Sequence, residues 1–381
     1  MRRMGVVLGL TLMAAMAARA QIGKIVGVAA GTPEDAAISE INATQDPAKK
    51  LALLDKFAAD HASGNYALLT DQLYVSVYTD EKNYDKAFEY GDKALAIDPD
   101  NFSTGVDLVR AADQAADAMK LAHYAEAVAA MIARYKTSPA PAGRTAEDWE
   151  KLQATTLQSV QTDLQYVEYA FYNSARKAPD PAARGALLER CVAAFPDSSY
   201  AKSAEMEVVF AYQAAEDNQK MLDAAQKILK DDPNNVTVLV SLADYWSDRN
   251  QRLVEAEADA KKALAALPTE AKPEGVADDQ WQKQTSLQKG LALSALGAVY
   301  ANEDKNALAL QEFQHADSLL ESDNFSYGRN LYRWGFTLAK MQRTIEARRT
   351  LTRAVKTNSP YSRVAAQTLD KIGGPLGPPS Q

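Results

Sequence analysis

The chain has little of the chemistry that marks metal-binding or catalytic proteins. It holds one cysteine and three widely separated histidines, His61, His123 and His315, none of them in an HExxH pattern or beside a cysteine pair. These absences argue against a zinc site and against a Cys–His nucleophile. The GxSxG, GxGxxG and P-loop motifs of hydrolases and nucleotide-binding proteins do not occur either. We therefore expect no metal, no cofactor and no catalytic site, and an enzyme is the least favoured alternative.

The single cysteine, Cys191, excludes an internal disulfide. It takes the place of a small apolar residue in a helical pattern, so we interpret it as a buried core residue rather than a reactive thiol. A chain without cross-links must be held together by packing. With 381 residues and 47% apolar content, it can bury a large or an extended core.

No apolar run reaches the roughly 20 residues that are needed to span a bilayer. The apolar residues 4–18 follow two arginines and precede the small-x-small triplet Ala18-Arg19-Ala20. This order is typical of a secretory signal peptide. We predict cleavage between Ala20 and Gln21 and export to the cell envelope or periplasm; an uncleaved membrane anchor is the alternative. Because Gln21 is not a cysteine, no lipid attachment is expected.

Strand patterns are also missing. Apolar residues recur at spacings of three and four, as in Leu69, Leu73 and Val77, and no run rich in Val, Ile and Thr alternates with polar residues. The pattern predicts an all-α protein with about sixteen short helices.

Residues 71–101 show how one unit is built. The spacing predicts a helix that ends near Tyr78, a short turn, and a second helix from about Tyr84 to Ile97. Pro99 ends the second helix, and Asp100 or Asn101 can cap the next one. The small residues Ala87, Gly91 and Ala94 share one face of the second helix, where they would allow close approach of its paired helix.

This unit resembles the tetratricopeptide repeat, a helix-turn-helix of about 34 residues. The resemblance rests on Tyr78, Tyr84, Ala87, Ala94 and Pro99, and similar residues recur in 202–235, in 236–268, from Gly297 to Ala316 and from Trp334 to Ala354. Residues 102–140 and 145–196 are helical but depart from the pattern. The resemblance implies a right-handed superhelical solenoid of antiparallel helix pairs, with a concave groove lined by the first helix of each pair.

A second regularity is an offset of 134 residues. It relates Asp46-Pro47 to Asp180-Pro181 and continues without a gap to Asn101 and Asn235. The match favours duplication of a block of about four units, with convergence of equivalent solenoid positions as the alternative. The stretches DPA…LLD and FPDSSYA also resemble, more weakly, helical repeats of bacterial envelope-assembly proteins.

Loops and composition divide the chain into expected segments. A capping-box pattern at Thr145 predicts a long helix that runs to Lys177, after a Pro-rich loop at 136–144. Whether 145–196 is a distorted unit or a hinge stays open. The segments are 1–20 (signal peptide), 21–45 (N-terminal extension), 46–140 (repeat-like units), 141–268 (units after a long helix), 269–286 (linker or enlarged loop), 287–372 (basic C-terminal units) and 373–381 (flexible tail).

The resemblance also implies which side chains would line the groove and contact a partner. They lack the lysine and asparagine set with which some cytosolic relatives clamp a peptide carboxylate. An ordinary packing role is the alternative for each of them. The candidate residues on first helices are Gln72, Ser76, Asp80, Met206, Phe210, Gln213, Val240, Asp244, Tyr332, Phe336 and Lys340.

Charge is segregated at the C-terminal end. The whole chain has a net charge of −8, but residues 329–371 hold ten basic side chains against two acidic ones. Arg349, Arg353 and Lys356 lie at spacings of four and three, on one predicted helix face. This region could dock an anionic surface or an acidic protein. The alternative is a solvated end cap that balances an acidic body.

Together these features favour a non-catalytic scaffold of the cell envelope that binds protein or peptide partners in a concave helical groove. An envelope-assembly or membrane-docking adaptor that uses the basic end is the alternative. Nucleic acid is not an expected partner for an exported protein, and the sequence does not indicate an oligomeric state.

Overall fold

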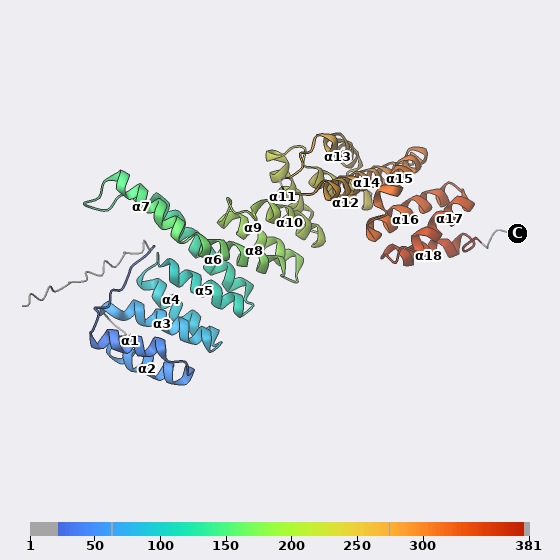
Figure 1. The fold of residues 1–381 in the computed structure, drawn as a ribbon. Helices are drawn as coiled ribbons and strands as arrows, with labels where there is room; N and C mark the ends of the chain where they lie inside the picture. The colour runs from blue at the N-terminus through green and yellow to red at the C-terminus, as the bar shows by residue number, and fades with distance from the viewer. Residues whose placement is uncertain (1–21, 62–63, 274, 377–381) are drawn as a thin grey trace, which may run out of the picture. The chain divides into compact units, whose positions relative to one another are not determined.

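The computed structural model describes residues 22–61, 64–273 and 275–376. The expected signal peptide, its cleavage point and residues 377–381 of the expected tail lie outside the described residues. Every regular element in the described ranges is a helix: 18 α-helices and two short 3-10 helices. The predicted all-α class is confirmed. The chain is a helical-repeat solenoid in which most helices pack against their neighbours in the sequence (Figure 1).

The chain forms two compact units, one up to Val208 and one from Val209. The boundary falls inside α10 (Ala201–Ala214). The first unit begins with α1 (Pro33–Ala43), α2 (Pro47–His61), the 3-10 helix η1 (Gly64–Tyr66), α3 (Ala67–Asp80), α4 (Tyr84–Ile97), α5 (Phe102–Gln114), α6 (Ala118–Thr137), α7 (Ala146–Ser159), α8 (Gln161–Arg176) and α9 (Pro181–Ala194).

The second unit is also built from consecutive helices that pack in pairs. They are α11 (Asn218–Asp231), α12 (Val236–Asp248), α13 (Leu253–Ala266), η2 (Leu267–Thr269), α14 (Asp278–Asn302), α15 (Asn306–Leu320), α16 (Asn324–Lys340), α17 (Thr344–Val355) and α18 (Tyr361–Lys371). The last helix packs on both α16 and α17 and so covers the end of this unit.

Six first helices end in the same turn. In α3, the N–H of Asn83 donates to the carbonyl of Tyr78, five residues earlier, at 2.8 Å, and the equivalent bonds elsewhere measure 2.8–3.0 Å. This bond satisfies a carbonyl at the helix end and needs a left-handed residue just before the donor. The left-handed residues are Lys82, Ala116, Glu216, Asn250, Asp304 and Gln342. The turn recurs after α5, so residues 102–137 form a regular pair that the sequence pattern did not identify.

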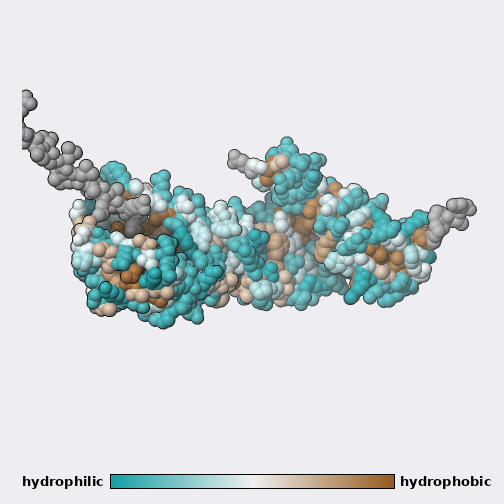
Figure 2. All heavy atoms as spheres, turned by 60° about the horizontal axis from the view of Figure 1, so that its bottom comes forward, coloured by the Kyte–Doolittle hydropathy of each residue, from teal (hydrophilic) through white to brown (hydrophobic). Residues whose placement is uncertain are grey.

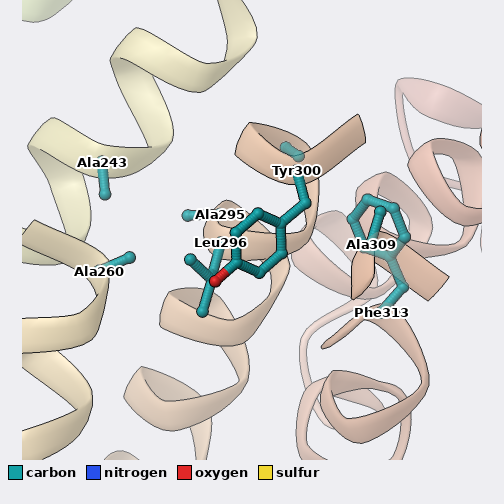
Figure 3. Close-up of a cluster of buried hydrophobic side chains, with 8 residues drawn as sticks. Ala243, Ala260, Ala295, Leu296, Tyr300, Ala309 and Phe313 are labelled. Carbon is teal, nitrogen blue, oxygen red and sulfur yellow. The ribbon is translucent and has the colours of Figure 1, made fainter. Parts of the chain in front are cut away.

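Small and aromatic residues fill the space between helices. In the second unit, Tyr300 of α14 and Phe313 of α15 lie among alanines of α12, α13, α14 and α15 (Figure 3). A Cβ atom on Gly297 would lie 2.7 Å from the Phe313 ring, so only glycine allows this approach. The outer surface in Figure 2 is mainly hydrophilic, with small separate hydrophobic areas.

Several predicted boundaries are confirmed. Helix α4 runs from Tyr84 to Ile97, and the Asn101 side chain accepts a hydrogen bond from the Thr104 N–H and caps α5. The Thr145 side chain caps α7 in the same way. Helix α14 begins at Asp278 and therefore includes residues that we expected to form a linker.

The long helix expected from 145 to 177 is wrong, because it breaks at Val160 into α7 and α8. Hydroxyl groups compete for backbone carbonyls just before the break. Thr155 donates to the carbonyl of Lys151, and Ser159 to that of Thr156. Such bonds bend helices.

The role predicted for Gly91 also needs correction. The three atoms nearest to a Cβ there would all belong to the Leu108 side chain, within 3 Å, so Gly91 allows close approach of α5, the first helix of the next pair.

Candidate functional site

The first helices of the second unit share a face on which a charged network lies. Asp244 of α12 accepts from Arg329 of α16 at 2.5 Å and from Arg333 at 2.9 Å. Asp248 forms further ion pairs with both arginines. Arg333 also approaches the Oγ of Ser294 on α14 at 3.3 Å. Three successive first helices, α12, α14 and α16, are therefore joined at one place.

This network is largely shielded from water. The side chains of Arg333, Arg329 and Asp244 are 9%, 12% and 14% exposed, whereas Asp248 is 40% exposed. Burial alone would raise the pKa of Asp244, but the positive charges of Arg333 and Arg329 outweigh it and hold that pKa below its ordinary value. Burial would likewise lower the pKa of Arg333, yet Asp244 and Asp248 raise it. Asp244 and Arg333 are thus both charged at neutral pH.

Aromatic side chains from α16 and α18 lie beside this network, and we call Phe325, Tyr332, Phe336 and Tyr361 the aromatic cluster. The Tyr332 ring centroid lies 6.0 Å from that of Phe336 and 6.1 Å from that of Tyr361. Phe325 meets Tyr361 edge-on at 5.6 Å, and the Arg329 guanidinium lies 5.4 Å from the Phe325 ring centre. Phe325 and Phe336 are nearly half exposed, at 47% and 46%. Exposed aromatic rings beside arginine are typical of protein interfaces.

The predicted groove residues of the second unit fall into different environments. Tyr332 and Phe336 belong to the aromatic cluster, whereas Asp244 is held by the arginines. Val240 is only 6% exposed and packs in a core between α12 and α13. Lys340 pairs with Asp304 at 3.2 Å in an exposed ion pair. The remaining two lie nearer the start of the unit: Phe210 is 40% exposed, and Gln213 accepts a hydrogen bond from Ser241.

The predicted residues of the first unit are dispersed. Gln72 of α3 donates to Asn101 and to Thr104 on α5, at 3.0 and 2.9 Å, and thereby joins two first helices. Ser76 is exposed, Asp80 lies 3.9 Å from Lys50 and Met206 is half-buried. These residues do not form a cluster with the chemistry of a single site.

Half of the ten basic side chains in the C-terminal region form ion pairs within the second unit. Besides Arg329 and Arg333, Lys340 pairs with Asp304, Arg343 with Glu346, and Arg353 with Asp317 at 2.8 Å. Arg348 donates to the carbonyls of Gly374 and Pro375. Of the three residues predicted to share one helix face, Arg349, Arg353 and Lys356, only Arg353 therefore forms an ion pair within the chain. The side chains of four further cations have neither an ion pair nor a hydrogen bond in the described part of the chain, and all are exposed: Arg349, Lys356, Arg363 and Lys371.

The lone cysteine and the potential metal ligands can also be placed. Cys191 is 4% exposed, as predicted, and burial, followed by the charge of Glu168, raises the pKa of its thiol to about 12. Over residues 22–61, 64–273 and 275–376, three or more potential metal ligands nowhere come together. The same ranges contain no helix with the length and apolarity needed to cross a bilayer.

The network of Asp244, Asp248, Arg329 and Arg333 is the feature of this face that sequence reasoning missed. Its signal was present, since the two acids and the two arginines each have a spacing of four on a first helix and carry opposite charges. Arg333 lies 89 residues from Asp244 and 85 from Asp248, with one helix pair between them, so the sequence alone could not match them. No protein-family model matches the chain, and no curated protein was found to be similar to it.

Proposed function

We propose that the protein is a non-catalytic scaffold of the cell envelope that binds protein partners on the first-helix face of its second unit. The fold is taken to be tetratricopeptide-like, as the residue pattern suggests, and the chain to be exported and cleaved after Ala20. The observation that carries the proposal is the half-exposed aromatic cluster beside the Asp–Arg network.

The physical case rests on rigidity and exposure. The network ties α12, α14 and α16 together, so the rings of Tyr332 and Phe336 are presented on a rigid surface. A partner that covers the half-exposed Phe336 ring and the partly exposed Tyr332 ring gains hydrophobic free energy at little cost in conformational entropy. The charges in the network already satisfy one another, so a partner need not supply counter-charges for them.

The test is chemical crosslinking of the tagged protein in its native envelope. We compare the wild type with Tyr332→Ser/Phe336→Ser, and use Val254→Ser/Ile345→Ser as the control. Val254 and Ile345 are also exposed, at 75% and 59%, but lie on the second helices α13 and α17. The proposal requires a specific partner that is lost with the first double variant and kept with the control. Loss with the control alone would contradict it.

An adaptor that docks on anionic lipid is the second candidate, favoured by the four unpaired cations near the C-terminus. Their number is smaller than the sequence suggested, because five of the ten basic side chains there are ion-paired and Arg348 binds backbone carbonyls. Each cation near an anionic membrane contributes about 1 kcal/mol. Co-sedimentation with phosphatidylglycerol vesicles should then be abolished by Arg349→Glu/Lys356→Glu and by high salt. If wild-type protein does not sediment at low salt, this candidate is excluded.

A further inference from the structure

The N-terminal segment of the described chain is bound to a junction between two helices. We call Asp98, Asn101 and Phe102 the α4–α5 notch, and residues 22–24 the strap. The Lys24 N–H donates to Asp98 Oδ2 at 2.6 Å, and the Asn101 side chain donates to the Lys24 carbonyl at 3.3 Å. The Phe102 N–H donates to the carbonyl of Ile22 at 3.3 Å.

The strap fits the notch closely. Ile22 is 1% exposed, and the notch residues Asp98 and Asn101 are only 4% and 0% exposed. Gly23 has a φ of +97°, and a Cβ there would lie 2.7 Å from backbone atoms of Asp100 and Asn101. The middle residue of the strap must therefore be glycine. The Lys24 ammonium donates to the carbonyl of Ile97 at 3.1 Å.

The offset of 134 residues places a second copy of this notch at the junction of α11 and α12. Asp232, Asn235 and Val236 are the equivalents of Asp98, Asn101 and Phe102, and we call them the α11–α12 notch. In both copies the asparagine side chain donates to the aspartate Oδ2, at 3.0 Å in the first and 3.1 Å in the second. In both, the asparagine N–H donates to the aspartate carbonyl at 3.1 Å. The two junctions thus have the same local geometry.

Two of the three residues of the second notch are more exposed than their equivalents in the first. Asp232 is exposed and Asn235 is half-buried, in contrast to their buried equivalents. The N–H of Val236, equivalent to the one that binds the Ile22 carbonyl, has no acceptor among the described residues. All three groups that hold the strap in the first unit are therefore repeated in the second, where Asp232 and Asn235 reach solvent and the Val236 side chain is buried in a core cluster.

The second notch is also more acidic than the first. Asp231 stands where the first notch has Ile97, next to the carbonyl that the strap lysine binds. Glu270 lies close enough to Asp232 that burial and the charge of Asp232 raise its pKa. Its Oε2 atom is buried without a hydrogen-bond partner in the described chain, and neither acid has a cation partner there. A basic ligand would relieve this repulsion.

We propose that the α11–α12 notch binds an extended segment of a partner protein with the chemistry of the strap: an apolar residue, a glycine and a lysine. The segment's backbone would pair with Asp232, Asn235 and the Val236 N–H, and its lysine would approach Asp231 and Glu270. This site is independent of the aromatic cluster and of the function proposed above.

The probe is the acetylated peptide Ile-Gly-Lys-Ile-Val-Gly, the sequence of residues 22–27, with a fluorophore at its C-terminus. Its anisotropy is measured as the full chain is added. We expect saturable binding that is at least tenfold weaker for Asp232→Ala and for Asn235→Ala. An Ile-Ala-Lys version of the peptide should bind at least tenfold more weakly to the wild type, because its alanine cannot adopt the backbone of Gly23 without strain.

Three results would overturn the proposal. The first is that the wild type does not bind the peptide at millimolar concentration, or that it binds the glycine and alanine peptides equally. The second is that binding survives Asp232→Ala but is lost with Asp98→Ala, which would place the peptide in the first notch in exchange for the strap. The third is that the chain self-associates without peptide and that Asp232→Ala abolishes this self-association, which would make a second copy the occupant. Circular dichroism of each variant checks that its helices are retained.

Discussion

At the scale of residues, a recurring feature is left-handed backbone at non-glycine residues, which costs conformational free energy. Six turns place a non-glycine residue at a φ between 52° and 60°. An L-residue in this region costs about 1 kcal/mol relative to glycine. The cost is accepted because the turn satisfies a carbonyl at the end of each first helix.

Replacing one of these residues by glycine should stabilise the protein. Ala116 is exposed and has a φ of 54°, so Ala116→Gly is expected to raise the free energy of unfolding by up to about 1 kcal/mol. Its neighbour Ala115 has right-handed backbone, with φ −72°, and provides the control. Ala115→Gly should lower stability by roughly 0.5–1 kcal/mol. Urea denaturation measures both, and equal effects of the two variants would contradict the explanation.

The buried Asp–Arg network is the second feature at this scale. Removing one partner of a buried ion pair leaves the other charge uncompensated, at a cost of about 3 kcal/mol. Asp244→Asn should therefore lower the melting temperature of the second unit by roughly 6–12 °C. The same substitution at Asp304, in the exposed pair with Lys340, should cost less than about 1 kcal/mol. Tryptophan fluorescence suits the measurement, because Trp246, Trp281 and Trp334 lie in this unit. Equal melting temperatures for both variants would argue against the network.

The ion pairs of Asp244 with Arg329 and Arg333 also predict how stability depends on pH. The pKa of Asp244 is held below its ordinary value in the folded state, so its stabilising effect is complete above about pH 4. The effect is lost as the pH falls through the lowered pKa. The difference in melting temperature between the wild type and Asp244→Asn should thus be constant from pH 7 to about pH 5 and shrink below pH 4. A difference that grows on acidification would contradict this sign.

At the scale of elements, the strap provides the sharpest test of local fit. Gly23→Ala should release residues 22–24, because the added Cβ would clash with the backbone of Asp100 and Asn101. Trypsin cleavage after Lys24 is then expected to become at least several-fold faster. Gly27→Ala is the matched control, since no atom lies within 4 Å of its Cβ position and its φ is not positive. Equal cleavage rates in the two variants would mean that the strap is not held as described.

Helices were predicted well where a residue with one strong preference marks the boundary. Tyr84, Pro99 and Asn101 fixed α4 and the cap of α5 because proline and a capping asparagine act locally. The break at Val160 was missed because hydroxyl back-bonding has no unique pattern. The α5–α6 pair was not identified as a repeat because its turn follows Ala112, where the other five units have an aromatic residue or leucine.

At the scale of the whole molecule, pattern and charge had different predictive value. Repetition along the chain predicted the class and most pairs, since each pair packs mainly on its neighbours. Segregated charge was less informative. Ten basic side chains in residues 329–371 suggested a docking surface, but five of them pair with acids from α12, α15 and elsewhere in the second unit. Such matching depends on contacts between distant residues, which no single sequence reveals.

The central claim is that partners bind the first-helix face of the second unit at the aromatic cluster. Its most direct test is a photo-crosslinking residue placed at Phe336 or, as a control of similar exposure, at Ile345 on α17, in the native envelope. Our account predicts a discrete adduct from position 336 that is absent from position 345. An adduct from position 345 alone, or none from either, would contradict it.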